Sequence, residues 1–136
     1  MKNFLSIHDV QNFPSLLELA KSEKKNPFAH QHLGKNKTLV LLFFNPSLRT
    51  RLSTQKAAQN LGMNVIVMNV GSDGWQMEME DGTVRNGGTQ EHIKEAVAVV
   101  SEYADIIGVR TFPTLTDKKA DYEEKVLQNF VKYSTV

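Results

Sequence analysis

The sequence predicts an α/β fold in which a parallel β-sheet is flanked by helices on both faces. Two apolar runs of strand length, "KTLVLLFF" (37–44) and "MNVIVMNV" (63–70), alternate with segments whose apolar residues recur at helical spacing. A chain of 136 residues with 40% hydrophobic and 23% charged residues is typical of one globular domain with a buried core. The order of the strands within the sheet is not fixed by the sequence.

The first half of the chain predicts two helices and two strands. Residues 15–25 follow Pro14 and show a helical pattern. Residues 37–44 form a continuous apolar run, which predicts a strand buried on both faces. Residues 48–61 predict a second helix, which Gly62 is placed to end, and the β-branched run 63–70 predicts a second strand. The apolar side of the first helix carries Leu16, Leu17 and Leu19.

The second half begins with a Gly-rich loop over 71–89, in which alternation before Asp81-Gly82 predicts a small hairpin. We expect Thr89 to cap the next helix, and residues 104–112 to form a third strand. A last helix is predicted from about Asp117. The buried stripes of the two helices are predicted to be Ile93, Ala96, Val97 and Val100 in one and Val126, Leu127, Phe130 and Val131 in the other.

Composition narrows the possible functions. Lys and Arg (16) nearly balance Asp and Glu (15), so the chain has no large net charge that would favour binding to nucleic acid or to a membrane. The absence of cysteine excludes disulfides, thiolate zinc sites and a cysteine nucleophile, and favours the cytoplasm. The N-terminal segment has no apolar core, so we expect no signal peptide. The histidines show no metal-ligand grouping, and no metal site is expected at His8, His30, His32 or His92.

Polar side chains follow the predicted strands at their carboxyl ends, where open parallel sheets bind ligands. Ser47, Arg49 and Thr50 come directly after the first strand and open a helix, while Arg110 ends the third. A helix N-terminus, hydroxyl donors and planar guanidinium groups together suit a phosphate or phosphate ester.

Simpler interpretations of these residues stay open. Ser47 can be only a helix cap, Arg49 and Arg51 solvated surface charges, and Arg110 an ion-pair partner. Trp75, the sole tryptophan, is more often a core or interface residue than a catalytic one.

Other nucleotide and phosphate folds fit poorly. The chain has no G-x-x-x-x-G-K-S/T motif and no G-x-G-x-x-G after a strand. A phosphoacceptor receiver domain would need acidic residues where Asn45 and Arg110 stand.

The segment "FFNPSLRTRLS" (43–53) resembles the S-x-R-T-R signature of the aspartate/ornithine carbamoyltransferase superfamily, in its carbamoyl-phosphate-binding half. Three more segments look like the N-acylornithine branch of that superfamily. They are "DGWQMEMEDGTV" (73–84), "EHIKEAVAVVSEYADIIGVRTF" (91–112) and "VLQNFVKYS" (126–134).

The resemblance implies transfer of a carbamoyl group from carbamoyl phosphate to the δ-amine of N-acetylornithine or N-succinylornithine, in arginine biosynthesis. Residues 1–136 would be the carbamoyl-phosphate-binding domain, and the ornithine-binding domain would lie in C-terminal sequence absent here. We therefore expect no turnover by this segment alone. The resemblance also implies a homotrimer and calls for no metal or organic cofactor.

Roles in the family can be carried onto matching positions. The resemblance implies that Ser47, Leu48 (through its backbone), Arg49 and Thr50 hold the phosphate. Arg110 would contact both the phosphate and the carbamoyl oxygen. In catalysis, Arg49 would neutralise phosphate, and Thr50 and Arg110 would polarise the carbonyl.

The resemblance also implies roles for three further residues. Trp75 would reach the phosphate in a neighbouring subunit, whereas Arg51 would anchor the loop without contacting ligand. Gln90 matches a position that looks like Glu in the acetyl-specific enzymes and like Pro in the succinyl-specific ones. An uncharged side chain there would not repel a succinyl carboxylate, which slightly favours N-succinylornithine.

The alternative is a non-catalytic phosphate-binding or regulatory module with the same fold. The enzyme interpretation requires coding sequence beyond Val136 that supplies a histidine-containing second domain. A gene that ended at Val136 would favour the binding module.

Overall fold

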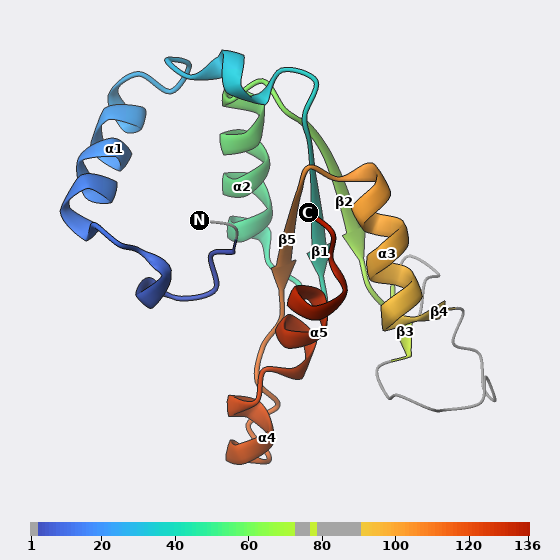
Figure 1. The fold of residues 1–136 in the computed structure, drawn as a ribbon. Coiled ribbons are helices and arrows are strands. Elements are labelled where there is room, and N and C mark those ends of the chain that lie inside the picture. The colour runs from blue at the N-terminus through green and yellow to red at the C-terminus, as the bar shows by residue number, and fades with distance from the viewer. Residues whose placement is uncertain (1–2, 73–76, 79–90) are drawn as a thin grey trace.

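A computed structural model of the chain describes residues 3–72, 77–78 and 91–136. Its central feature is a three-stranded parallel sheet of β1 (Thr38–Phe43), β2 (Asn64–Asn69) and β5 (Ile106–Arg110). The strand order is β2-β1-β5, so β1 lies in the middle, and the three arrows run in the same direction (Figure 1). The predicted α/β class is confirmed, and the strand order is added by the structure.

Helices cover both faces of this sheet because β1 buries both of its sides. Val40 and Leu42 point into a core formed with α3 (Ile93–Tyr103) and α5 (Lys125–Tyr133). On the other face, Leu39, Leu41 and Phe43 pack against Ala58 of α2 (Leu48–Asn60). Alternate residues of the apolar run therefore serve two cores, as expected for a strand buried on both faces.

Helix α2 has a clear signal at each end. Ser47 is the N-cap, and its side-chain oxygen accepts a hydrogen bond from the backbone N–H of Thr50 at 3.3 Å. At the other end Gly62 adopts a φ of 82°, and the amide of Met63 donates to the carbonyl of Ala58 at 3.0 Å. This is the Schellman arrangement, for which glycine is the favoured residue, so the predicted end of the helix is confirmed.

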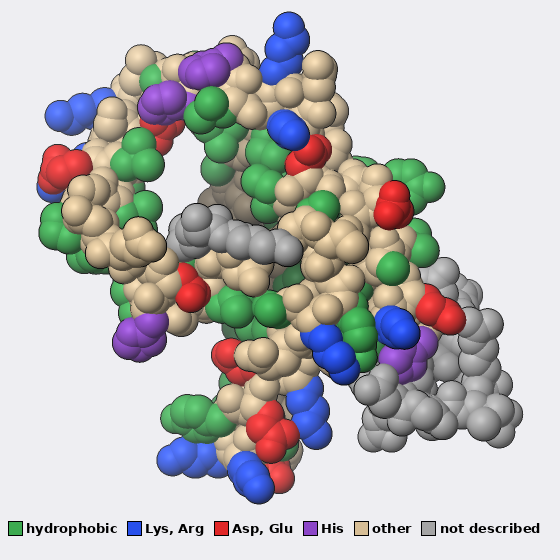
Figure 2. Space-filling model, viewed as in Figure 1, with side chains coloured by type: hydrophobic (Ala, Val, Ile, Leu, Met, Phe, Trp, Pro, Cys, Tyr) green, Lys and Arg blue, Asp and Glu red, His purple; other side chains and the backbone are tan. Residues whose placement is uncertain are grey.

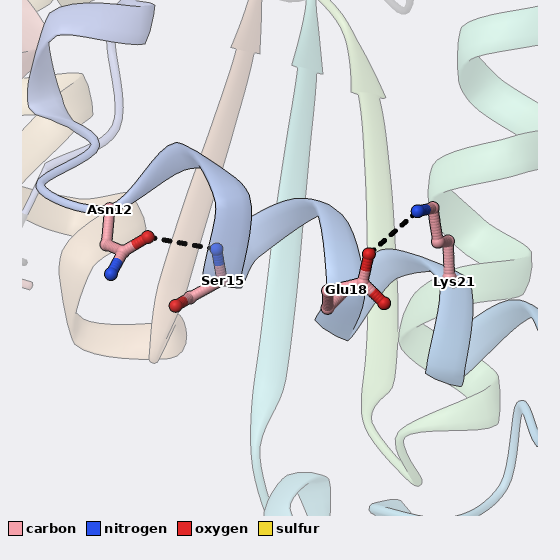
Figure 3. A network of polar contacts seen from close by, with 4 residues as sticks. All are labelled: Asn12, Ser15, Glu18 and Lys21. Carbon is pink, nitrogen blue, oxygen red and sulfur yellow. Dashed lines mark hydrogen bonds and ion pairs between the residues drawn. The ribbon is translucent and has the colours of Figure 1, made fainter.

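Helix α1 (Phe13–Lys25) is well formed but contains no buried residue. Asn12 caps it through a 3.0 Å hydrogen bond from the Ser15 amide, and Glu18 pairs with Lys21 at 2.7 Å (Figure 3). The helix stands apart from the sheet on an N-terminal arm that also holds two short 3-10 helices, η1 (Ile7–Asp9) and η2 (Gln31–Gly34) (Figure 1). Hydrophobic side chains lie on the surface of this arm (Figure 2), among them Leu16, Leu17 and Leu19.

The start of α3 differs from the prediction. The helix begins at Ile93, and its N-cap is His92, whose ring nitrogen accepts from the Lys94 amide at 3.2 Å. The expected cap, Thr89, lies outside the described residues. The two residues before Ile93 form β4 (Glu91–His92), which is extended and pairs in parallel with β3 (Met77–Glu78). Most of the expected hairpin before Asp81-Gly82 lies outside the described residues, so that expectation stays a prediction. The predicted buried stripe of α3 is confirmed by Ile93, Ala96, Val97 and Val100.

The predicted last helix is two helices. A short α4 (Lys118–Tyr122) is separated from α5 by Glu124, which adopts a left-handed φ of 45°. In α5 Phe130 is buried and Val126 packs against the same core, but Val131 is 37% exposed, so only part of the predicted stripe is confirmed. In the part of the chain that the structure describes, no helix is both long and apolar enough to cross a membrane.

Candidate functional site

The carboxyl ends of the three strands meet at one edge of the sheet. Phe43, the last residue of β1, lies opposite Asn69 of β2 on one side and Arg110 of β5 on the other. The chain then turns through Asn45 and Pro46 and enters α2 at this edge (Figure 1). The fold therefore brings the predicted site residues of the first and third strands to the same end of the sheet.

The first turn of α2 offers hydrogen-bond donors. The side chain of Ser47 satisfies the amide of Thr50, but the amides of Leu48 and Arg49 donate to no other described residue. Leu48, Arg49 and Thr50 are all exposed. Two unsatisfied amides at the positive end of a helix dipole, beside the Arg49 side chain, form a suitable environment for an anion.

Arg110 is bound to the turn that precedes this helix. Its Nη1 donates to the carbonyl of Asn45 at 2.7 Å and to that of Pro46 at 2.9 Å. Its guanidinium carbon also lies 4.1 Å from the centre of the Phe112 ring. The side chain thus crosses from the end of β5 to the end of β1, and its Nε and Nη2 groups have no hydrogen-bond partner within the described residues.

Arg51 is held on the other side of the same turn. Its guanidinium carbon lies 5.0 Å from the centre of the Phe43 ring, and Nη2 donates to the side-chain oxygen of Asn69. The side chain therefore ties the first turn of α2 to the ends of β1 and β2. This geometry agrees with an anchoring role for Arg51.

A hollow of about 630 Å³ lies between the ends of β1 and β2. Of the predicted ligand-binding residues, Ser47 and Leu48 line it, whereas Arg49, Thr50 and Arg110 do not. The structure thus brings the predicted residues to one edge of the sheet without placing them all on one wall. The described lining is Phe43, Phe44, Asn45, Pro46, Ser47, Leu48, Arg51, Asn69, Val70, Gly71 and Ser72.

The charged side chains of the described residues at this edge are arginines. No Asp or Glu is among the described residues that line the hollow. Arg49, Arg51 and Arg110 form no ion pair with any carboxylate of the described residues. An arginine without a carboxylate keeps its charge available to a ligand, and guanidinium groups bind phosphate oxygens in a planar, two-point geometry. The described residues also contain no group of three or more His, Asp or Glu side chains able to hold a metal ion.

Two predicted positions cannot be placed, and two others were missed. Trp75 and Gln90 lie outside the described residues. No role was predicted for Asn45 or Asn69. Asn45 accepts a hydrogen bond that links the ends of β1 and β5, and Asn69 accepts one that links α2 to the end of β2. An asparagine directly after a strand was the available signal for Asn45, because Asn side chains in turns commonly accept hydrogen bonds from backbone amides.

Comparison with known proteins identifies relatives along nearly the whole chain. The sequence profile of the family described as aspartate/ornithine carbamoyltransferase, carbamoyl-P binding domain, matches residues 2–136. An N-succinylornithine carbamoyltransferase of Bacteroides thetaiotaomicron is 47% identical over 134 residues, which are 98% of this chain and 42% of that protein. An N-acetylornithine carbamoyltransferase of Xanthomonas campestris pv. campestris is 41% identical over 138 residues, which cover 100% of this chain and 40% of the relative.

Solved structures agree with the sequence relatives. A mutant of N-acetyl-L-ornithine transcarbamylase, complexed with carbamyl phosphate and N-succinyl-L-norvaline, superimposes with a TM-score of 0.91 at 41% identity. The match covers 100% of this chain and 41% of that one. The chain therefore spans about two-fifths of the length of the relatives it matches.

Proposed function

Since the chain belongs to the aspartate/ornithine carbamoyltransferase family through its carbamoyl-phosphate-binding domain, we propose that it is the half of an N-acylornithine carbamoyltransferase that holds carbamoyl phosphate. The observation that carries the proposal is the common location of the S-L-R-T-R segment and Arg110. The segment opens α2 at the edge of the sheet where Arg110 binds the preceding turn. The relatives are named N-succinylornithine carbamoyltransferase and N-acetylornithine carbamoyltransferase, which supports an N-acylornithine as the second substrate.

The proposed reaction is a carbamoyl transfer in arginine biosynthesis. The δ-amine of an N-acylornithine attacks the carbonyl carbon of carbamoyl phosphate, and a C–N bond forms. The C–O bond to the phosphate then breaks, the amine loses a proton, and the products are an N-acylcitrulline and inorganic phosphate. Negative charge develops on the carbonyl oxygen and on the departing phosphate, so donors aimed at both lower the barrier.

The residues at the sheet edge are suited to these two tasks. We assign Ser47, the backbone amide of Leu48 and the side chain of Arg49 to the phosphate, because a helix start and a guanidinium group both favour oxyanions. Thr50 and Arg110 are assigned to the carbonyl oxygen, and Arg110 to the phosphate as well. In Arg110 the Nε and Nη2 donors remain for these contacts after Nη1 has bound the turn.

The complete enzyme requires more than residues 1–136. We propose that a C-terminal domain binds the acylornithine, in keeping with relatives more than twice as long as this chain. By family resemblance we also propose a cytoplasmic homotrimer in which Trp75 reaches the phosphate site of a neighbouring subunit. Holding the two substrates together between domains would supply a large part of the rate enhancement.

The proposal also concerns which acyl group the substrate carries. Gln90 carries no charge, so it would not repel the second carboxylate of a succinyl group as a glutamate would. We therefore favour N-succinylornithine over N-acetylornithine.

One assay tests the proposal directly. The full-length protein is supplied with carbamoyl phosphate and, in parallel, with ornithine, N-acetylornithine or N-succinylornithine, and phosphate release is measured. We expect turnover with the two acylated substrates, higher kcat/KM with the succinyl compound, and none with ornithine. Binding of carbamoyl phosphate without turnover of any amine would instead support the phosphate-binding module.

A further inference from the structure

We propose that Asn45 is a positioning residue that sets the direction of the Arg110 guanidinium toward the bound carbamoyl phosphate. The inference rests on the proposed function and concerns how its site is assembled. Asn45 is the second residue after β1, and neither the helix cap nor the assigned ligand contacts include its side chain.

The inference starts from a closed ring of contacts between the ends of β1 and β5. The side-chain oxygen of Asn45 accepts from the backbone amide of Phe112 at 2.8 Å. The ring of Phe112 lies against the guanidinium of Arg110, with 4.1 Å between guanidinium carbon and ring centre. Arg110 in turn donates to the carbonyl of Asn45 at 2.7 Å, which closes the ring on the residue where it began.

Each contact fixes something different about Arg110. The Asn45 and Pro46 carbonyls hold one nitrogen, Nη1, and leave the guanidinium plane free to rotate about that point. The flat face of Phe112 restricts this rotation, because a guanidinium group packs parallel or edge-on to an aromatic ring in only a few orientations. The Phe112 ring is itself exposed by 58%, so surrounding packing does little to hold it.

The Asn45 side chain therefore has a specific task. Phe112 follows the last residue of β5 by two positions, beyond the sheet ladder, and its amide has the Asn45 oxygen as its hydrogen-bond acceptor. No other hydrogen bond among the described residues ties Phe112 to β1, so loss of this bond is expected to let the ring that restricts Arg110 shift. A small misplacement of a charged donor is costly when the ligand must be held in a defined geometry.

The test uses the full-length protein and calorimetric titration with carbamoyl phosphate. Asn45→Ala is expected to weaken binding by about tenfold, the effect of losing one hydrogen bond that supports a charged group. The affinity for the acylornithine should not change, and the far-UV circular dichroism spectrum should be that of the wild type. Asn64→Ala is the matched control, because Asn64 is an exposed asparagine at the start of β2, at the opposite edge of the sheet.

Two further variants keep the test decisive. Phe112→Leu retains the backbone amide and an apolar side chain at an exposed position, and it should weaken carbamoyl-phosphate binding about threefold by removing the aromatic face. Asn45→Ala in an Arg110→Lys background should have almost no additional effect, because a residue that acts through Arg110 is not additive with its replacement.

Several results would overturn the inference. They are wild-type affinity in Asn45→Ala, an equal loss in Asn64→Ala, or full additivity of Asn45→Ala with Arg110→Lys. A wild-type protein that gives no binding heat with carbamoyl phosphate would overturn the proposed function itself, which separates the two failures.

Discussion

Strands β1 and β5 are joined by side-chain hydrogen bonds at both of their ends, but the charges at the two ends differ. At the amino ends the carboxylate of Asp105 accepts from Lys37 Nζ at 2.7 Å and from the Thr38 amide at 2.8 Å, so positive and negative charges neutralise each other. At the carboxyl ends Arg110 donates to the neutral carbonyls of Asn45 and Pro46. The same pair of strands is thus closed by an ion pair at one end and, at the other, by a cation that forms no ion pair with a described carboxylate.

This difference is the physical reason for placing the proposed ligand site at the carboxyl ends of the strands. The ion pair at the amino ends is neutral as a unit, and its hydrogen bonds join the start of β1 to the residue before β5. Among the described residues, the carboxyl ends combine a guanidinium that has no carboxylate partner with the start of α2, where two amides have no hydrogen-bond partner. Under the proposed function, the phosphate group of the substrate supplies the counter-charge.

Arg110→Ala provides the largest expected effect. In the full-length protein kcat should fall by about 100- to 1000-fold, because Arg110 is the proposed donor to the developing oxyanion. Steady-state kinetics with carbamoyl phosphate and N-succinylornithine would measure it. Lys37→Ala removes a cation from the other end of the sheet and should leave kcat within about twofold of wild type, as most surface substitutions do. Equal losses in both variants would contradict a functional difference between the ends.

Arg51→Lys tests whether geometry as well as charge matters at the carboxyl end. Lysine keeps the positive charge but cannot both cover the Phe43 ring and donate from a planar group to Asn69. We expect kcat/KM for carbamoyl phosphate to fall by about tenfold, the consequence of one lost positioning interaction of a charged group. An unchanged kcat/KM would show that any cation at position 51 is sufficient.

Asp105→Asn should have the smallest effect, and only on stability. The hydrogen bond from Lys37, followed by that from the Thr38 amide, holds the pKa of the Asp105 carboxyl below its ordinary value of 3.8. The ionised carboxylate therefore stabilises the fold above the unfolded-state pKa, and this contribution is lost as the pH falls through the lower folded-state pKa.

The prediction for Asp105→Asn concerns thermal unfolding at different pH values. The variant should melt at a slightly lower temperature than wild type at pH 7, and the difference should disappear in acid below the lowered pKa. Carbamoyl-phosphate affinity at pH 7 should be the same in both. A difference in Tm that persists in strong acid would show that ionisation of Asp105 does not stabilise the fold.

Local sequence signals predicted the elements that position the site. The continuous apolar run of β1, the Ser47 cap and the Gly62 terminus each depend on residues a few positions apart, and all three were found in the structure. The stripe from Ile93 to Val100 succeeded for the same reason, because helical periodicity reports burial directly.

The features that were missed depend on contacts distant in the sequence. The start of α3 was misplaced because Glu91–His92 is extended by pairing with Met77–Glu78, which no local pattern encodes. The break at Glu124 has no glycine or proline to signal it. The contact of Asn45 with Phe112 spans 67 positions, so only the strand order reveals it.

The proposed phosphate-binding residues rest on family resemblance more than on spacing. Physical reasoning alone indicated an anion at the start of α2 and left open whether Ser47 was only a cap. The structure shows that Ser47 is a cap. Its oxygen accepts from Thr50, and its hydroxyl hydrogen has no acceptor among the described residues. Capping and ligand binding are therefore compatible at this position.

The most direct test of an anion at the start of α2 is calorimetric titration of carbamoyl phosphate into the full-length Arg49→Ala variant. Arg49 is exposed, so the substitution should leave the fold intact. Lys56→Ala, which removes a cation further along the same helix, is the control. We predict that binding heat disappears in Arg49→Ala and is unchanged in Lys56→Ala. Wild-type affinity in Arg49→Ala would contradict the assignment of this edge of the sheet as the site of carbamoyl-phosphate binding.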